Sequence, residues 1–120
     1  MLTTQKPVTG AMIKQAIEGR DGDMLSSFYR TDAVVRVIDH NNPPSRPREI
    51  RGRKSVAEFW DDICSRTITH RVDTSIAEGD RLAFTQACTY PDGARVFCMA
   101  AIELKDGLIA EQTVVQAWDE

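Results

Sequence analysis

The fold of this 120-residue chain is decided by residues 81–104, which read RLAFTQACTYPDGARVFCMAAIEL. On both sides of Pro91-Asp92-Gly93, apolar and more polar side chains alternate with the period of two that is typical of β-strands. An Asp-Gly pair between two such runs is a strong signal for a tight turn. The segment therefore predicts a long β-hairpin, one face of which carries the even-numbered residues Leu82, Phe84, Gln86, Cys88, Val96, Cys98, Ala100 and Ile102.

The same alternation continues on both sides of this hairpin. From Thr67 onward the sequence predicts four strands joined by turns at Glu78-Gly79, Asp92-Gly93 and Asp106-Gly107. If each turn is a three-residue loop with glycine in the left-handed conformation, even-numbered residues pair with even-numbered residues throughout. That face is mainly apolar, and we expect it to be the inner face, lining a pocket. Besides the hairpin residues it would hold Ile68, His70, Val72, Thr74, Ile76, Leu108, Ala110, Gln112, Val114, Gln116 and Trp118.

The odd-numbered face is small and semi-apolar at its centre, with Ala83, Thr85, Ala87, Phe97 and Met99. A sheet face that is fully in water normally carries more charge than this. We therefore expect a homodimer in which the outer sheet face of each copy covers that of the other. The alternative is an ordinary exposed face that tolerates alanine and threonine.

The N-terminal half predicts three helices and one strand. Apolar residues at helical spacing indicate a helix from about Thr9 to Gly19, and Asp21 can cap a second helix. Residues 33–40 are β-branched and predict the first strand, with Asp39 at the end of its inner, apolar row. A capping-box pattern and an apolar stripe indicate a third helix from about Ser55 to Arg66.

Residues 41–54 are rich in proline and arginine. Three prolines predict that residues 41–52 have no regular structure. A loop of this length is often a lid or rim over a site, and its arginines would then favour a ligand with a carboxylate or phosphate. A solvated connector is the equally open alternative.

Composition excludes several classes of protein. The length predicts a single domain over residues 1–120. A net charge of −3 gives no basic surface for nucleic acid. The start of the chain has no leader pattern, and no run approaches the ~20 apolar residues of a membrane span, so we expect no membrane partner and a cytoplasmic protein.

Nothing in the sequence indicates a cofactor. Cys64, Cys88 and Cys98 are odd in number and lack the spacing of metal ligands, which predicts buried thiols and no metal site. A disulfide or redox pair of Cys88 and Cys98 is the alternative. No nucleotide or flavin motif is present, so any activity is expected to be independent of a cofactor.

The order of these elements resembles the nuclear transport factor 2-like superfamily and, within it, the SnoaL-like group. The anchor points are Gly52, the Val56/Phe59/Trp60 helix, Asp106-Gly107, Ile109 and the terminal run VVQAWD at residues 114–119. The resemblance implies a cone-shaped α+β fold of order α-α-β-α-β-β-β-β, with three N-terminal helices packed on a strongly curved, mostly antiparallel sheet. It also implies an apolar cavity and dimers through the sheet.

The resemblance does not select a reaction, because this fold hosts ketosteroid isomerases, polyketide cyclases, scytalone dehydratases, epoxide hydrolases and non-catalytic members. The isomerases have a carboxylate at the end of the first strand, where Asp39 or His40 is a rough match. Their tyrosine on the first helix is missing, and their acid on the penultimate strand is replaced by Ala100 and Ala101. A dehydratase-like site needs two histidines, and the chain has only His40 and His70.

Three residues are therefore the catalytic candidates: Asp39, His40 and His70. An apolar cavity shifts the pKa of a carboxylic acid upward and that of an imidazole downward, which brings both toward neutrality. The alternatives are that Asp39 caps the following loop and that His70 is a hydrogen-bonded core histidine. The ligand-binding candidates are Trp60, Phe84, Gln86, Cys98, Gln112, Gln116 and Trp118.

Two functions stay open at this point. The first is an acid-base isomerase, cyclase or dehydratase that acts on a small hydrophobic molecule in an apolar cavity. The second is a non-catalytic module for small-ligand binding or dimerisation.

Overall fold

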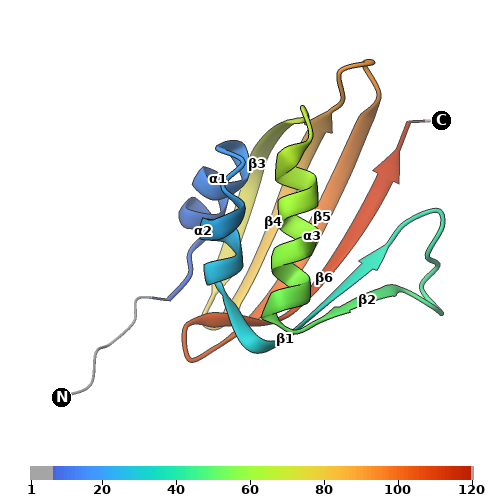
Figure 1. The fold of residues 1–120 in the computed structure, drawn as a ribbon. Helices are drawn as coiled ribbons and strands as arrows, with labels where there is room; N and C mark the ends of the chain where they lie inside the picture. Colours follow the sequence, from blue (N-terminus) through green and yellow to red (C-terminus); the bar gives the residue numbers. More distant parts are fainter. Residues whose placement is uncertain (1–6, 120) are drawn as a thin grey trace.

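Three helices cover one face of a six-stranded sheet in the computed structural model of the chain, which describes residues 7–119 (Figure 1). Residues 1–6, where the sequence analysis finds no leader pattern, lie outside the described part, as does Glu120. The elements are α1 (Gly10–Glu18), α2 (Gly22–Ser27), β1 (Tyr29–Ile38), β2 (Arg48–Arg51), α3 (Arg53–Ser65), β3 (Thr69–Glu78), β4 (Arg81–Thr89), β5 (Arg95–Lys105) and β6 (Leu108–Trp118).

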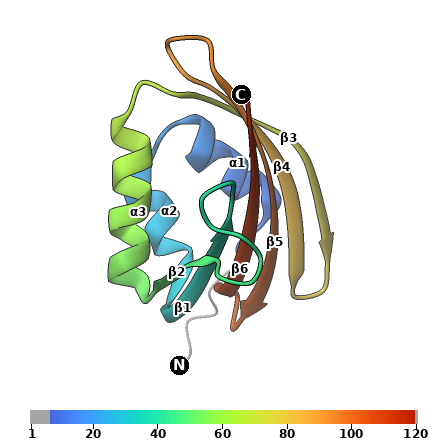
Figure 2. The same ribbon diagram turned by 90° about the vertical axis from the view of Figure 1, so that its right-hand side faces the viewer.

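The sheet curves around the helices, and its strand order is β2-β1-β6-β5-β4-β3 (Figure 2). β1 and β6 pair in parallel, and the other neighbours are antiparallel. The last strand therefore lies between the first strand and the central hairpin. The predicted α+β class, with helices on a curved and mostly antiparallel sheet, is confirmed.

The β4–β5 hairpin has the predicted register. Phe84 pairs with Ala100 and Gln86 with Cys98, so even-numbered residues share the inner face. The tip is the predicted three-residue loop, because Tyr90 N donates to Ala94 O at 2.9 Å across Pro91-Asp92-Gly93. Gly93 takes a φ of +93° in that loop, a conformation that favours glycine.

The other two turns contain two residues where the sequence predicts three. Glu78 pairs with Arg81, and Lys105 pairs with Leu108 across Asp106-Gly107, whose φ angles are both positive. A two-residue loop pairs odd with even positions, so each ladder contains a bulge where the pairing changes.

These bulges overturn part of the predicted inner face. In β3 the shift lies between Val72 and Thr74, and it turns Thr74 and Ile76 outward, so that Ile76 is 65% exposed. In β6 the shift leaves Ile109 buried where the sequence predicts Leu108 and Ala110. The pattern of alternation does not show where a bulge changes the face.

Residues 41–52 contain a strand, although their three prolines predict no regular structure. β2 is an edge strand whose Ile50 pairs with Val35 of β1. Pro43, Pro44 and Pro47 all precede it, so the prolines do not interrupt its ladder. β1 also begins at Tyr29, earlier than the predicted start at residue 33.

The helix starts agree with the sequence in two of three cases. Thr9 and Asp21 cap α1 and α2 with side-chain oxygens that accept from Met12 N and Met24 N. α3 begins at Arg53, before the predicted Ser55, and its N-cap Gly52 makes no side-chain hydrogen bond. The prediction of a capping box at Ser55 is therefore wrong. The backbone leaves β2 with a φ of +86° at Gly52 and enters the helix there.

The predicted core positions are filled as the pattern indicates. Val56 and Trp60 of α3 are buried in the core between the helices and the sheet, as are Val35 and Val37 on the inner face of β1. Cys88 and Cys98 are buried free thiols, and Cys64 is half-buried. Among the described residues, no helix is long and apolar enough to cross a membrane. The cytoplasmic location stays a prediction.

Candidate functional site

A cavity of about 200 Å³ lies between α3 and the inner face of the sheet. Its walls come from α3, the four strands β3–β6, the residue after β1 and the start of β2, and they are mainly apolar, with Phe84, Val96, Ala100 and Val114 among them. All the candidate site residues named from the sequence line it except His40: Asp39, Trp60, His70, Phe84, Gln86, Cys98, Gln112, Gln116 and Trp118.

His70 is the buried titratable side chain on the β3 wall. It is 8% exposed, and its Nδ1 lies 3.2 Å from Cys88 Sγ. Its Nε2 is buried and has no hydrogen-bond partner among the described residues. Burial, with a smaller effect of the Arg20 charge, lowers the pKa of His70, so the imidazole is neutral near pH 7 and can take up a proton.

The thiols of Cys88 and Cys98 extend a row of polar side chains from His70 across the sheet. A hydrogen bond between Cys88 and Cys98, together with burial, raises the pKa of Cys88. For Cys98 the hydrogen bond from Cys88 and a further one from Gln86 lower the pKa, against the opposing effect of burial. His70 contacts Cys88, and Gln86 pairs with Cys98 across β4 and β5, so all four side chains lie together on the cavity wall.

The other end of this row of polar side chains, Gln86, also lacks a hydrogen-bond partner. Gln86 is 8% exposed, and its Oε1 is buried with no hydrogen-bond partner among residues 7–119. Buried polar atoms in folded proteins are nearly always hydrogen-bonded. His70 Nε2 and Gln86 Oε1 are thus the two atoms of the described part at which a ligand could supply a missing hydrogen bond.

Tyr29 holds a second polar cluster beside the cavity. Its hydroxyl donates to Gln112 Oε1 and accepts from Trp60 Nε1 at 3.2 Å, while Trp60 and Gln112 themselves line the cavity. Complete burial raises the pKa of Tyr29 despite these hydrogen bonds, so the phenol stays protonated.

Tyr29 is not among the residues predicted from the sequence, because the resemblance points to a tyrosine on the first helix and Tyr29 follows α2. Tyr29 begins β1, just before the residues predicted as the first strand. A buried tyrosine needs a partner for its hydroxyl, so a tyrosine at the start of an apolar strand could have been noticed.

Asp39 lies at the edge of the cavity and closes the loop that follows β1. Its Oδ1 accepts hydrogen bonds from the backbone N–H groups of Asn41 and Asn42 and from Asn42 Nδ2, each at 2.9 Å. Partial burial acts to raise the pKa of Asp39, but the hydrogen bonds from Asn42 and Asn41 outweigh it, and the pKa lies below its usual value. Asp39 is therefore a weaker base than a free aspartate.

His40 lies outside the cavity lining. It is exposed, and its ring packs edge-on against Trp118 with the ring centres 6.2 Å apart. In residues 7–119 no hydrogen bond joins Asp39, His40 and His70 to one another. The structure thus brings Asp39 and His70 to one cavity and leaves His40 at its mouth.

The mouth itself is aromatic and charged. Tyr90 packs on Trp118 with ring centres 5.5 Å apart, and Arg48 lies 5.4 Å above the ring centre of Phe59. Arg48 comes from the arginine-rich segment that follows β1, so this segment contributes one residue to the cavity. A role of the segment as a rim for an anionic ligand stays a prediction.

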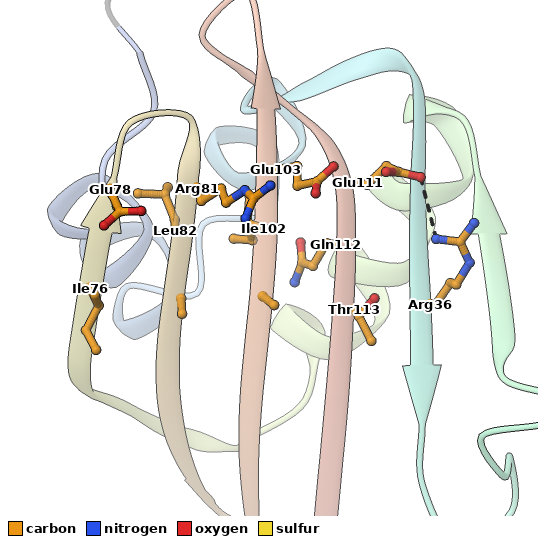
Figure 3. A pocket seen from close by; sticks show the side chains of 12 residues that line it. Arg36, Ile76, Glu78, Arg81, Leu82, Ile102, Glu103, Glu111, Gln112 and Thr113 are labelled. Atoms are coloured by element: carbon orange, nitrogen blue, oxygen red, sulfur yellow. Dashed lines mark ion pairs between the residues drawn. The ribbon is translucent and has the colours of Figure 1, made fainter.

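A larger hollow, of about 460 Å³, opens on the outer sheet face (Figure 3). Its charged residues form a row across the strands, in which Arg36 Nη1 lies 3.7 Å from Glu111 Oε1. No buried atom without a partner belongs to this hollow. The inner cavity is therefore the better candidate site. Among the described residues, no group of three or more His, Cys, Asp or Glu could hold a metal ion.

Comparisons with known proteins agree with this architecture. A family model described as SnoaL-like domain matches residues 10–112. No curated protein sequence matches the chain significantly. Among solved structures, an NTF2-like protein of unknown function from Mesorhizobium loti has a TM-score of 0.75 at 18% identity, with 88% of this chain and 84% of that chain covered.

Two further structures are similar in the same way. A protein from Kribbella flavida, provisionally assigned as a ketosteroid isomerase, has a TM-score of 0.72 at 21% identity, covering 92% of this chain and 74% of its own. An NTF2-like protein of unknown function from Burkholderia xenovorans has a TM-score of 0.73 at 18% identity, covering 92% and 79%. Identities this low establish the fold alone. Because the family model spans most of the sequence, the chain belongs to the SnoaL-like domain family.

Proposed function

We propose that this protein binds a small, largely apolar molecule in the inner cavity. The observation that carries the proposal is the pair of buried polar atoms without a partner, His70 Nε2 and Gln86 Oε1, in an otherwise mainly apolar wall. A buried polar group without a hydrogen bond costs about 1–3 kcal/mol. A ligand that bonds to these atoms would recover part of that cost.

The volume limits the size of the molecule. An apolar cavity of about 150 Å³ in another protein binds benzene. A cavity of about 200 Å³ is therefore large enough for a substituted six-membered ring and too small for a steroid without rearrangement of the walls.

The catalytic form of the proposal is a cofactor-independent acid-base reaction, an isomerisation, cyclisation or dehydration, with His70 as the group that moves the proton. Its lowered pKa keeps the imidazole neutral, as a general base requires, and its Nε2 has no hydrogen-bond partner in residues 7–119. Asp39 is the poorer base, since three hydrogen bonds stabilise its charged form.

A non-catalytic binding protein is the second candidate, and the state of Asp39 favours it. A general base with a lowered pKa and an oxygen engaged in closing a loop has a structural task already. His70→Phe separates the two candidates, because this variant keeps an aromatic ring and removes the base. Turnover that disappears while ligand affinity persists supports the enzyme, and unchanged turnover eliminates His70 as the base.

Binding itself is tested by thermal unfolding in the presence of toluene and related single-ring compounds. A ligand that binds only the folded chain raises the midpoint temperature of unfolding, and the increase grows with the ligand concentration. If no such compound does so, and no small molecule is released when the purified protein is denatured, the proposal fails.

We also propose a homodimer through the outer sheet face. Phe97, Met99 and Val115 are 46%, 56% and 48% exposed on that face, and Met99 and Val115 are direct partners on β5 and β6. A contiguous apolar group on an outer sheet face is typical of a surface that is covered by another protein chain.

A further inference from the structure

The two unpartnered atoms come from neighbouring positions on the cavity wall. His70 pairs across β3 and β4 with Cys88, which lies two residues from Gln86 on the same face. His70 and Gln86 are therefore diagonal neighbours, about 7–8 Å apart in the backbone, a span that long side chains bridge. One small polar group in the cavity can contact both side chains.

The unpartnered atom of Gln86 limits which groups can bind to it. Gln86 pairs with Cys98 across β4 and β5, and its buried amide oxygen Oε1 has no hydrogen-bond partner among the described residues. An amide oxygen can only accept a hydrogen bond.

His70 allows more kinds of ligand group than Gln86 does. Its Nδ1 interacts with Cys88 Sγ, and Nε2 carries a proton in one tautomer and a lone pair in the other. The group that occupies the cavity must donate to Gln86, and at His70 it can either donate or accept. A hydroxyl group meets both requirements, since it has one donor and two acceptor positions.

We propose that the ligand of this cavity is a compact apolar ring that carries a hydroxyl group, and that the hydroxyl lies between His70 Nε2 and Gln86 Oε1. The inference rests on the proposed function, because it specifies which molecule the cavity accepts. A hydrocarbon leaves both atoms unpaired. An ether or a ketone has only acceptor oxygens, so it leaves Gln86 Oε1 unpaired.

Three single-ring probes, two of nearly equal shape and one larger by a methyl group, test this inference by isothermal titration calorimetry. p-Cresol has a hydroxyl group, p-xylene replaces it with a methyl group, and 4-methylanisole keeps the oxygen without its proton. The wild-type chain should bind p-cresol at least about tenfold more tightly than either analogue, because only p-cresol pairs both buried atoms.

The variants connect this selectivity to the two side chains. Gln86→Leu and His70→Phe should each lose most of the preference for p-cresol while still binding p-xylene. Gln15→Leu is the matched control, since it makes the same change from amide to leucine at an exposed position of α1. Its selectivity should equal that of the wild type.

Nitrogen-15 NMR of the histidine rings gives a reading in the unaltered protein, independent of whether a variant folds. Comparison with His70→Phe assigns the His70 signals, or, if that variant does not fold, a substitution of the exposed His40 does so by difference. The Nε2 shift of His70 should move with p-cresol and stay in place with p-xylene.

The outcomes distinguish a failure of the hydroxyl inference from a failure of the proposed function. Equal affinity for all three probes, or tighter binding of 4-methylanisole, overturns the hydroxyl inference and leaves a cavity for apolar molecules. Failure of every probe to bind removes the proposed function together with the inference. Movement of the His70 Nε2 shift with p-xylene as much as with p-cresol also contradicts the inference.

Discussion

Replacement of Tyr29 by phenylalanine should destabilise the protein far more than the loss of one hydroxyl group at the surface would. The hydroxyl is completely buried, donates to Gln112 Oε1 and accepts from Trp60 Nε1. Phenylalanine keeps the ring, so the packing changes little, but it leaves two buried polar atoms without this partner. At about 1–3 kcal/mol for each of the two unpaired groups, we expect a loss of about 2–6 kcal/mol. Domains of this size are stable by only about 5–15 kcal/mol, so the effect is a large fraction of the whole.

The assay is urea unfolding followed by far-ultraviolet circular dichroism, because Trp60 fluorescence would respond to the substitution itself. Tyr90→Phe is the matched control: Tyr90 is only half-buried at the cavity mouth, and its substitution should change the free energy of unfolding by about 0.5 kcal/mol or less. In the double variant with Gln112→Leu, the two costs should not add, since one substitution already breaks the shared hydrogen bond. If Tyr29→Phe costs no more than Tyr90→Phe, the buried cluster does not stabilise the fold.

Three further predictions concern the other wall and the outer face. The pKa of His70 is lowered in the folded state, so the stability that this residue contributes is present above its unfolded pKa of about 6.5 and is lost as the pH falls below that value. The free energy of unfolding should therefore decline less between pH 6.5 and 5 in His70→Phe than in the wild type. Parallel pH profiles of the two proteins would contradict this prediction. Gln86→Leu removes an unpaired buried oxygen, so the ligand-free variant should be as stable as the wild type or more stable by about 1 kcal/mol, and a clear loss of stability in thermal unfolding would mean that the oxygen is already paired. Phe97→Asp and Met99→Asp should convert a dimer into a monomer in light scattering at micromolar concentration, whereas a wild-type chain that is already monomeric would refute the proposed dimer.

The central part of the fold could be predicted because its signals are local. The alternation in residues 81–104 and its Asp-Gly turn fix the β4–β5 register, and the observed pairing of Gln86 with Cys98 follows from it. β2 cannot be predicted, because four residues are too few to show a period and the prolines before it indicate irregular structure. Ile76 lies on the face opposite to the predicted one, because a bulge in β3 compensates for a two-residue turn and nothing in the alternation marks a bulge.

The candidate site could be predicted only as far as the alternation extends. His70, Gln86 and Gln112 were identified as polar residues on an inner face, and all three are buried there. The contacts that give them their chemistry connect distant parts of the chain, such as Tyr29 with Gln112 and His70 with Cys88. These contacts depend on which strands are neighbours and on register, which the sequence shows for the central hairpin but not for β1 against β6.

The central claim, that the inner cavity binds a small ring-shaped molecule, is tested most directly by NMR titration of the amide and methyl signals with p-cresol. The account predicts saturable shifts that concentrate on residues of the cavity wall such as Phe84, Ala100 and Val114. Shifts that concentrate on Ala83, Ala101 and Thr113 around the outer hollow, or no saturable shift at all, would contradict it.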